Sequence, residues 1–295
     1  MKVAIFTNLY KKYSSKYLLS TIKKLLNKSI DVFIDEKSIE NMGKKKYNSL
    51  SKLIGAFSKL DKSFDYAICI GGDGTILRAS TYINSLSIPI IGINTGRLGF
   101  LAKIKPVEIN NVVNVLINKK YEISERTLVA ISSISKNQKR KKLGYALNEI
   151  SITRKNTTSL ITIETKLNGN YLNTYWADGL IIATPTGSTG YSLSCGGPII
   201  MPESKNLVIT PIAPHNLNAR PLVIPDNTEI TIKISGRENE FFVSLDSEMT
   251  TLSNENIISI KKASHRIKMV ELEKEDFLKT LRDKLLWGKD KRTKQ

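Results

Sequence analysis

A short run of glycines around one carboxylate is the part of the sequence best suited to phosphate chemistry. Gly71-Gly72-Asp73-Gly74-Thr75 follows the apolar run 66–70, which has the composition of a fully buried parallel strand. Glycines let a backbone approach a phosphate closely, and free N–H groups at the start of a following helix favour an anion. Asp73 itself would repel a phosphate, so we expect it to serve as a base for an attacking hydroxyl or to hold a metal on the phosphate. The plainer alternative is an ordinary strand-to-helix turn in which Asp73 caps the helix.

A second stretch, residues 177–198, carries hydroxyl side chains interleaved with glycines. Gly187 and Gly190 lie among Thr184, Thr186, Ser188, Thr189, Ser192 and Ser194. The pattern is too polar for a core and too regular for a linker, and hydroxyls with free backbone N–H groups suit a ligand rich in oxygen atoms. Asp178 could accept hydrogen bonds from two ribose hydroxyls, and Tyr191 offers a flat ring or a hydroxyl. The alternative is a surface turn that is merely rich in serine and threonine.

Two other polar sites carry weaker signals. Asn148-Glu149 interrupts an apolar run, and a half-exposed strand face explains such a pair as well as a binding site does. His215 lies in a proline-rich loop, which favours a solvated or structural role. The sequence contains neither GxxxxGK[ST] nor GxGxxG, so it supports neither a P-loop enzyme nor an ordinary Rossmann dehydrogenase.

The elements that must position these residues fall into two domains and a tail. Over residues 1–120, strand-like runs alternate with helical patterns, which predicts a doubly wound, Rossmann-like α/β domain. Ligands bind such sheets at the carboxyl ends of the strands, where the 71–75 turn and a second glycine loop, 95–101, both lie. The predicted strands are 3–6, 30–34, 66–70 and 89–94, the predicted helices are 17–26, 76–86 and 107–117, and 44–62 is predicted to be a loop or a solvated helix.

Short runs with partial alternation fill residues 121–270 and predict a β-rich, sandwich-like domain. Asn168-Gly169 predicts a hairpin turn within it. In the tail, 271–295, the segment 275–287 is amphipathic and is expected to pack back onto the first domain, whereas the residues from 288 onward are expected to fray.

Composition limits the partners. Lys and Arg number 45 against 27 Asp and Glu, a net charge of +18, but the excess is spread along the chain without interleaved aromatic residues that could stack bases. We therefore expect small polyphosphate anions rather than nucleic acid, and keep a nucleic-acid-binding module as the non-enzymatic alternative. No apolar run approaches the ~20 residues of a membrane span. Cys69 and Cys195 suggest neither pairing nor metal spacing, which predicts a reducing, cytoplasmic setting.

The four polar stretches in this order resemble the NAD kinase family. They are 71–75, Asn94-Thr-Gly-Arg-Leu-Gly-Phe-Leu101, Asn148-Glu149, and the stretch from Asp178 to Tyr191, and the match covers most of the chain. The first motif is shared with diacylglycerol, sphingosine and phosphofructokinase-type kinases, whereas the hydroxyl-rich loop is highly specific. The resemblance implies phosphorylation of the 2′-hydroxyl of the adenosine ribose of NAD, with ATP, or in some members inorganic polyphosphate, as donor and a divalent metal, Mg²⁺ being expected.

The resemblance also implies residue roles. Asp73 would be the general base, with Gly74 packed near the nucleotide, Arg78 at a phosphate and Phe100 near an adenine. Asn148 and Glu149 would bind the adenine or ribose of NAD, and Asp178 would hold the nicotinamide-side ribose. The remaining expected contacts are Thr189, Gly190, Tyr191, Ser192, Leu193, Ser194 and Glu248.

Two of these positions depart from the family pattern. Gly190 stands where many members have alanine, a change that should leave the pocket intact, and Glu248 stands where glutamine is common. The resemblance further implies assembly as a dimer or tetramer, with a site shared across subunits. The main rival is a lipid kinase of the diacylglycerol type, which would need an apolar slot for acyl chains, and the hydroxyl-rich 184–194 loop argues against one.

Overall fold

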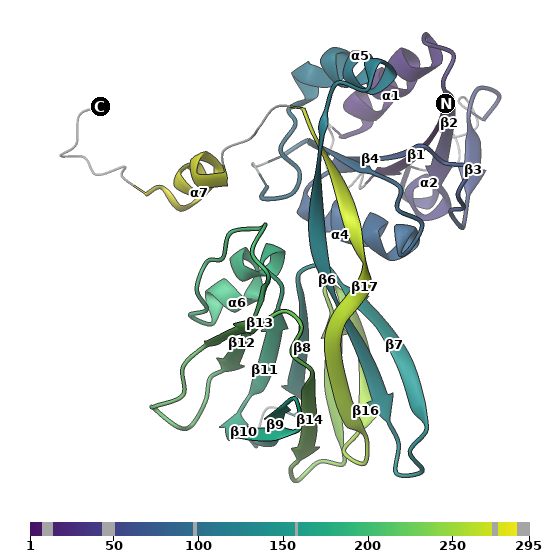
Figure 1. Ribbon diagram of the computed structural model, residues 1–295. Coiled ribbons are helices and arrows are strands. Elements are labelled where there is room, and N and C mark those ends of the chain that lie inside the picture. The colour runs from purple at the N-terminus through teal and green to yellow at the C-terminus, as the bar shows by residue number, and fades with distance from the viewer. Residues whose placement is uncertain (8–13, 43–50, 97–98, 157–158, 273–276, 288–295) are drawn as a thin grey trace. The chain divides into compact units, whose positions relative to one another are not determined.

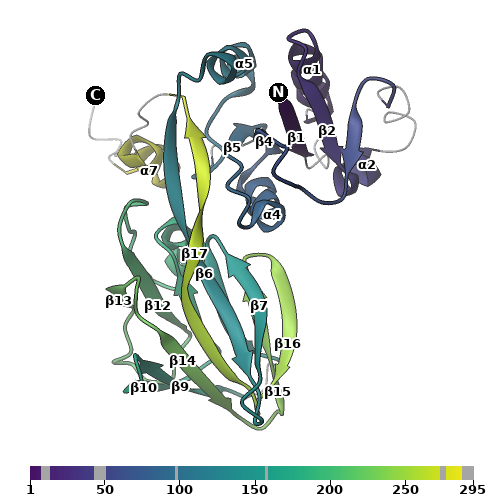
Figure 2. The same cartoon turned by 45° about the vertical axis from the view of Figure 1, so that its right-hand side comes forward.

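The protein divides into two compact units, which are described separately (Figures 1 and 2). Unit 1 comprises Met1–Glu125 and Ile267–Gln295, and unit 2 comprises Arg126–Arg266. The computed structural model describes residues 1–7, 14–42, 51–96, 99–156, 159–272 and 277–287. Two long strands, β6 (Glu122–Ile134) and β17 (Ile257–Glu271), carry the chain from one unit into the other.

Unit 1 is built on a parallel sheet. Its strands stand in the order β5-β4-β1-β2-β3, with consecutive neighbours parallel. The bounds are β1 (Lys2–Thr7), β2 (Asp31–Asp35), β3 (Gly55–Phe57), β4 (Tyr66–Gly71) and β5 (Ile90–Asn94). The direction of winding reverses between β1 and β4, and this switch point is where such sheets bind ligands. The glycine turn 71–75 leaves β4 at that point.

The helices cover both faces of this sheet (Figure 1). α1 (Ser14–Leu26) and α5 (Ile109–Asn118) share one apolar cluster with β1 and β2, whereas α4 (Asp73–Ile83) buries Ile76, Ala79 and Ile83 on the other face. Shorter helical segments are α2 (Glu36–Met42), η1 (Pro106–Glu108) and α7 (Phe277–Leu285). Over the part of the chain that the structure describes, no helix is long and apolar enough to cross a membrane.

The α/β character predicted for the first part of the chain is confirmed, with two local differences. The polar stretch 44–62 is not wholly a loop or helix, because β3 forms at 55–57 beside β2; residues 43–50 lie outside the described part. The helix α2 was not predicted, because its sequence EKSIENM is too short and polar to show an apolar period.

Unit 2 is a sandwich of two antiparallel sheets. One contains β7 (Arg140–Ala146), β9 (Ile161–Leu167), β10 (Asn170–Ala177) and β14 (Ile230–Ser235) with parts of β6 and β17. The other contains β8 (Glu149–Arg154), β11 (Gly179–Ala183), β12 (Asn206–Ile212), β13 (Leu222–Pro225), β15 (Glu240–Leu245) and β16 (Glu248–Ser253).

Alternate residues of both sheets fill one core, as period-two strands require. Ile163 and Ile232 of the first sheet and Ile152 and Val243 of the second belong to the same buried cluster. The predicted sandwich-like fold is therefore confirmed. The predicted hairpin is also confirmed, since Asn168 (φ 49°) and Gly169 (φ 83°) join β9 to β10.

Candidate functional site

Asp73 fastens the second glycine loop to the first. Its Oδ2 accepts the backbone N–H of Phe100 at 2.8 Å, and its Oδ1 accepts those of Leu101 and Ala102 at 3.1 and 2.9 Å. Asp73 is the first residue of α4. The N-cap position belongs to Gly72, which has no side chain that could cap the helix. The alternative that Asp73 caps the helix is therefore wrong, because the carboxylate is turned towards the loop instead.

Glycine at position 99 is what allows this close contact. A Cβ added to Gly99 would lie 1.9 Å from Asp73 Oδ1. Asn94 holds the same loop from the end of β5, donating from Nδ2 to the Ala102 carbonyl at 2.9 Å and accepting the Gly96 N–H at 2.8 Å. The loop is thus fixed through its backbone, and residues 97–98 lie outside the described part.

The acceptor count of Asp73 limits what else its carboxylate can do. A carboxylate offers about four lone-pair positions, and three backbone donors already occupy three of them. Oδ1 is saturated, so Oδ2 alone retains a position for one further donor or for a metal. Among the described residues, no cluster of three or more His, Cys, Asp or Glu is arranged to hold a metal ion. The open Oδ2 position could supply one carboxylate ligand to a Mg²⁺ ion whose other ligands are substrate phosphate oxygens and water.

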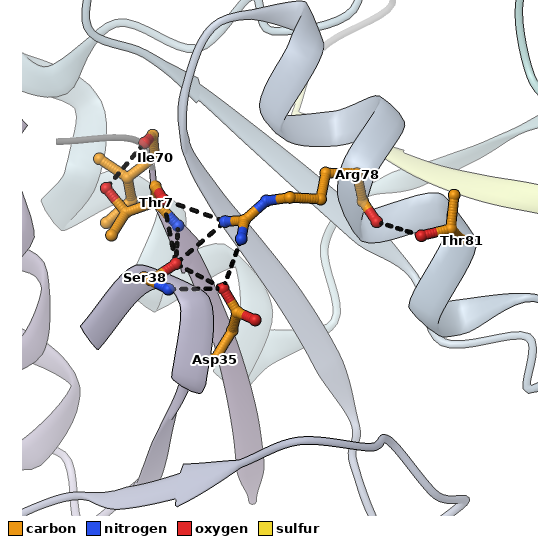
Figure 3. A network of polar contacts seen from close by, with 6 residues as sticks. All are labelled: Thr7, Asp35, Ser38, Ile70, Arg78 and Thr81. Atoms are coloured by element: carbon orange, nitrogen blue, oxygen red, sulfur yellow. Dashed lines mark hydrogen bonds and ion pairs between the residues drawn. The ribbon is translucent and has the colours of Figure 1, made fainter. Parts of the chain in front are cut away.

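Arg78, which was expected to meet a phosphate, lies in an internal network (Figure 3). Its Nη1 is 2.7 Å from Asp35 Oδ2, and its Nη2 donates at 3.0 Å to the Thr7 carbonyl and to Ser38 Oγ. Asp35 is 1% exposed and also accepts from the Ser38 side chain. The network ties α4 to the carboxyl ends of β1 and β2. The phosphate contact of Arg78 stays a prediction, and it would have to compete with these partners.

Two other predicted residues of unit 1 flank the turn. Gly74 is exposed, and nothing lies within 4 Å of a Cβ built there, which leaves room beside the helix start. The Phe100 ring lies 6.2 Å from the Phe277 ring of α7, and the Lys284 Nζ lies 4.9 Å from the Phe100 centroid. Phe100 is half-buried, so part of its surface remains exposed.

In unit 2, Asp246 holds the Asn148–Glu149 backbone in the way that Asp73 holds its loop. Asp246 Oδ2 accepts the Leu147 N–H at 2.9 Å, and Oδ1 accepts the N–H groups of Asn148 and Glu149 at 2.8 and 3.1 Å. The Asp246 N–H in turn donates to the Glu149 carbonyl at 3.0 Å. Sequence reasoning did not give Asp246 this role. The structure places it in the turn between β15 and β16 with a φ of +51°, and no periodic or compositional pattern in the sequence points to its distant partners.

The hydroxyl-rich stretch is not a loop but forms the 3-10 helix η2 (Thr186–Thr189) and the short helix α6 (Tyr191–Ser194), and it packs against the same segment. The Thr184 hydroxyl donates to the Leu147 carbonyl at 2.6 Å, and its N–H donates to the Asn148 carbonyl at 2.8 Å. A Cβ at Gly187 would lie 2.0 Å from the Asn148 carbonyl oxygen, and one at Gly190 would lie 2.9 Å from Glu149 Oε2. Two stretches far apart in sequence, and the Asp246 turn with them, therefore form one cluster.

The residues of this stretch divide into two groups. Thr184, Ser188 and Ser192 are buried and hydrogen-bonded within the protein; Ser192 Oγ, for example, lies 2.8 Å from Thr210 Oγ1. The members that remain at least partly open are Thr189, Gly190, Tyr191, Leu193 and Ser194. The buried hydroxyls shape the stretch, and the open members are the ones available to a ligand.

Glu149 has the most perturbed carboxyl of this cluster. Burial, then the neighbouring Asp246 charge, raises its pKa to about 7, and the Tyr191 backbone N–H opposes the shift. Its Oε2 is buried and has no hydrogen-bond partner within the described structure. An unpaired buried oxygen is costly, and a hydrogen-bond donor that reached Oε2 would remove that cost.

The other two predicted contacts differ from each other. Asp178 pairs with Arg154 through two bonds, Nε to Oδ1 at 3.0 Å and Nη2 to Oδ2 at 3.1 Å, and both side chains are partly exposed. Glu248 begins β16 and is exposed. The structure places Asp178 beside the end of β10 and Glu248 two residues beyond Asp246; a ligand contact for either stays a prediction.

Comparison with known proteins decides the family. The model of the ATP-NAD kinase N-terminal domain matches residues 3–121, and that of the ATP-NAD kinase C-terminal domain matches residues 147–272. The chain belongs to the NAD kinase family. NAD kinase family relatives include the "NAD kinase" of Flavobacterium psychrophilum, 55% identical over 99% of this chain and 100% of its own length, and that of Bacteroides fragilis, 42% identical over 99% and 100%.

Solved structures of the same family share the fold. The crystal structure of yeast NADH kinase complexed with NADH has a TM-score of 0.87 at 24% identity and covers 100% of this chain and 90% of its own. The NAD kinase from Archaeoglobus fulgidus in complex with ATP has a TM-score of 0.74 at 24% identity, covering 97% and 99%. At this level of identity the likeness supports the fold alone.

Proposed function

We propose that this protein transfers the terminal phosphoryl group of ATP to the 2′-hydroxyl of the adenosine ribose of NAD, which yields NADP. The observation that carries the proposal is the 55% identity to a curated NAD kinase over essentially the whole of both chains. Yeast NADH kinase complexed with NADH and the Archaeoglobus fulgidus NAD kinase in complex with ATP, which share the fold, bind the same two classes of substrate. The same identity does not favour the alternative of a lipid kinase.

Asp73 is proposed as the general base, through Oδ2. The backbone donors from Leu101 and Ala102 fill Oδ1, whereas Oδ2 accepts one N–H and keeps one open position. A hydroxyl donating to that position would be oriented for attack, and the carboxylate would take up its proton late in the transfer. A divalent metal such as Mg²⁺, when bound, would neutralise charge on the phosphoryl oxygens.

The cluster in unit 2 is proposed as the NAD-binding surface. Asn148 and Glu149 would bind adenine or ribose, and the open residues from Thr189 to Ser194 would line the pocket. A reducing, cytoplasmic setting and assembly into a dimer or tetramer belong to the same proposal; the free thiols of Cys69 and Cys195 support the former.

The test is to incubate the purified protein with ATP, Mg²⁺ and NAD and to measure NADP with an NADP-specific dehydrogenase, running diacylglycerol with labelled ATP in parallel. We expect NADP from the wild type and a drop in turnover of about 10²–10⁴ in Asp73→Asn, the range of general acid–base contributions, with NAD binding retained. Labelled lipid without NADP would overturn the proposal. Unchanged turnover in Asp73→Asn would remove Asp73 from catalysis.

A second variant separates the two uses of Asp73. Gly99→Ala keeps the carboxylate but places a Cβ where Oδ1 now lies, so the loop must move away from Asp73. If only the base matters, Gly99→Ala should retain most of the turnover that Asp73→Asn loses. Equal losses in both variants would show that the fastened loop is needed as well.

A further inference from the structure

A basic trough on one sheet of unit 2 shares no lining residue with the cluster around Glu149 and Asp246. It has a volume of about 410 Å³, within the range of small-ligand sites. Its lining residues are Ala130, Ser132, Arg140, Lys142, Tyr145, Ser259, Lys261, Lys262, Ala263 and Ser264. None of these ten residues, all in the described part of the chain, is acidic.

The hollow exists because small residues lie between long ones. Strand β6 pairs with β7 on one side and β17 on the other, and its residues Ala130 and Ser132 supply part of the floor. Strand β7 places Tyr145 opposite Ala130 and Lys142 opposite Ser132. On β17, Ser259 and Ala263 are small and buried, whereas Lys261 between them is exposed. The cationic side chains thus come from β7 and β17, and the strand between them, β6, contributes only small side chains.

A β-bulge brings the ring of Tyr145 to the cationic face. The register shifts so that Ile131 pairs with Gly144 and Ser132 pairs with Lys142, which leaves Leu143 as an extra residue. Side chains alternate along a strand, so without the extra residue Tyr145 would face away from Lys142. Instead the Lys142 Nζ lies 4.1 Å from the Tyr145 ring centroid. The bulge needs Gly144, whose φ is +152° and whose added Cβ would lie 2.7 Å from Leu245.

The charges of the trough are held in place but not cancelled. Glu229 accepts from Lys261 at 3.0 Å and from Ser259 at 2.9 Å and lies 3.6 Å from Arg140, and Asp226 lies 2.8 Å from Lys262. Four cationic side chains against two carboxylates leave a formal excess of two positive charges. Glu229, whose pKa is lowered mainly by Lys261, therefore anchors the cations without neutralising the site.

We propose that this trough binds a small oligophosphate anion, such as a phosphorylated metabolite, at a site distinct from the proposed substrate site. Ammonium, guanidinium and hydroxyl groups together offer the charge-assisted donors that phosphate oxygens accept. Tyr145 is the one aromatic residue in the lining, which is too few to stack a single strand of nucleic acid.

The first experiment measures binding of inorganic tripolyphosphate to the full chain by calorimetry, with NAD at saturating concentration. Lys142→Ala and Lys261→Ala should each weaken binding about tenfold, as expected for loss of one charge-assisted contact. Lys155→Ala is the matched control, because Lys155 is an exposed lysine of unit 2, paired with Glu240, and its loss changes the net charge equally. Equal effects of all three variants, or no binding at all, would overturn the proposal.

His265 reports on the trough independently of turnover. Its ring lies 4.6 Å from that of Tyr145, and its pKa is lowered by burial and then by Lys142. An anion beside Lys142 should therefore raise the pKa of His265. The chain has two histidines, so the imidazole NMR signals of the His215→Gln variant belong to His265. Signals unmoved by tripolyphosphate, or binding of an oligonucleotide in its place, would contradict the small-anion site; neither result depends on the NAD kinase proposal.

Discussion

Two aspartates, Asp73 and Asp246, each fix three consecutive backbone N–H groups with a single carboxylate. Each lies in a different unit and holds a loop that carries predicted substrate contacts. A carboxylate used in this way orients its neighbours and leaves few acceptor positions of its own. At both positions the carboxylate therefore serves to hold main chain in place.

Glu149 gives a pH-dependent prediction at the residue scale. Because its pKa rises from an ordinary 4.5 to about 7 on folding, the folded state binds more protons between these values, and the free energy of unfolding falls as pH rises through that window. Glu149→Gln removes this loss. We expect the variant to match the wild type near pH 4.5 and to exceed it by about 2 kcal/mol at pH 8, a value reduced for partial exposure.

Urea unfolding of both proteins at pH 4.5 and pH 8 measures this difference. Comparing the two proteins at each pH removes the contributions of the other titrating groups, which the substitution leaves in place. A constant difference between the two proteins across the range would show that Glu149 keeps an ordinary pKa in the folded state.

At the scale of elements, the network around Arg78 explains how the first sheet departs from a dinucleotide-binding Rossmann domain. In those domains a carboxylate near the end of the second strand binds the ribose. Here Asp35 ends β2, but it is buried and paired with Arg78 and Ser38 (Figure 3). The position is used to join α4 to the sheet. The carboxylate that remains available at this edge of the sheet is the one in the turn after β4.

The turn between β15 and β16 provides a second prediction, since Asp246 joins it to the segment before β8. Asp246→Ala leaves three backbone N–H groups without their acceptor, so we expect a loss of about 2–3 kcal/mol in the free energy of unfolding. Because the Asn148–Glu149 backbone is then released, the KM for NAD should rise more than kcat falls. Urea unfolding and steady-state kinetics measure the two effects.

Thr250→Ala is the control for stability, because Thr250 is exposed on β16 and such changes cost within about 0.5 kcal/mol. A KM for NAD unchanged in Asp246→Ala, with stability reduced, would limit Asp246 to a structural role. Rescue by Asp246→Glu would not be expected, because a longer side chain displaces the carboxylate from all three donors.

At the scale of the whole molecule, the two units differ in whether one continuous segment of the chain forms them. Unit 2 is a single segment, 126–266, whereas unit 1 needs both ends of the chain. Its sheet includes the pairing of Ile90 with Met269 of β17. We expect the fragment 126–266 to fold by itself into the sandwich, because every member of its buried cluster lies within that segment.

A shorter fragment, 147–266, is the matched comparison. It begins where the C-terminal family model begins and lacks Val129, Ile131 and Ala146 of the buried cluster. Each of the two larger side chains contributes about 1.5–3 kcal/mol when buried, so this fragment should unfold at markedly lower urea. Circular dichroism and urea midpoints of both fragments test this. Failure of 126–266 to fold would mean that unit 2 depends on unit 1.

The sequence by itself determined the class of both folds and the family. Apolar runs with alternating strand and helix patterns predicted the α/β order of the first part, and period-two runs predicted the sandwich of the second. Both patterns are local, because the residues that a strand or helix buries recur at a fixed spacing along the sequence. The motifs 71–75 and 184–191 were equally local. Glycine and hydroxyl residues that lie close together in sequence already indicate a site for phosphate groups and for a ligand rich in oxygen atoms.

Only the tertiary structure decided how these residues are used. Whether Asp73 caps its helix or holds a loop 27 residues away, whether Arg78 is open or paired with Asp35, and that Asp246 fixes Asn148–Glu149 all depend on contacts between distant segments. Hydrogen-bond partners that lie far apart in the chain leave no periodic or compositional trace. The same holds for the raised pKa of Glu149, because burial and a neighbouring charge are properties of the folded cluster and not of the residue.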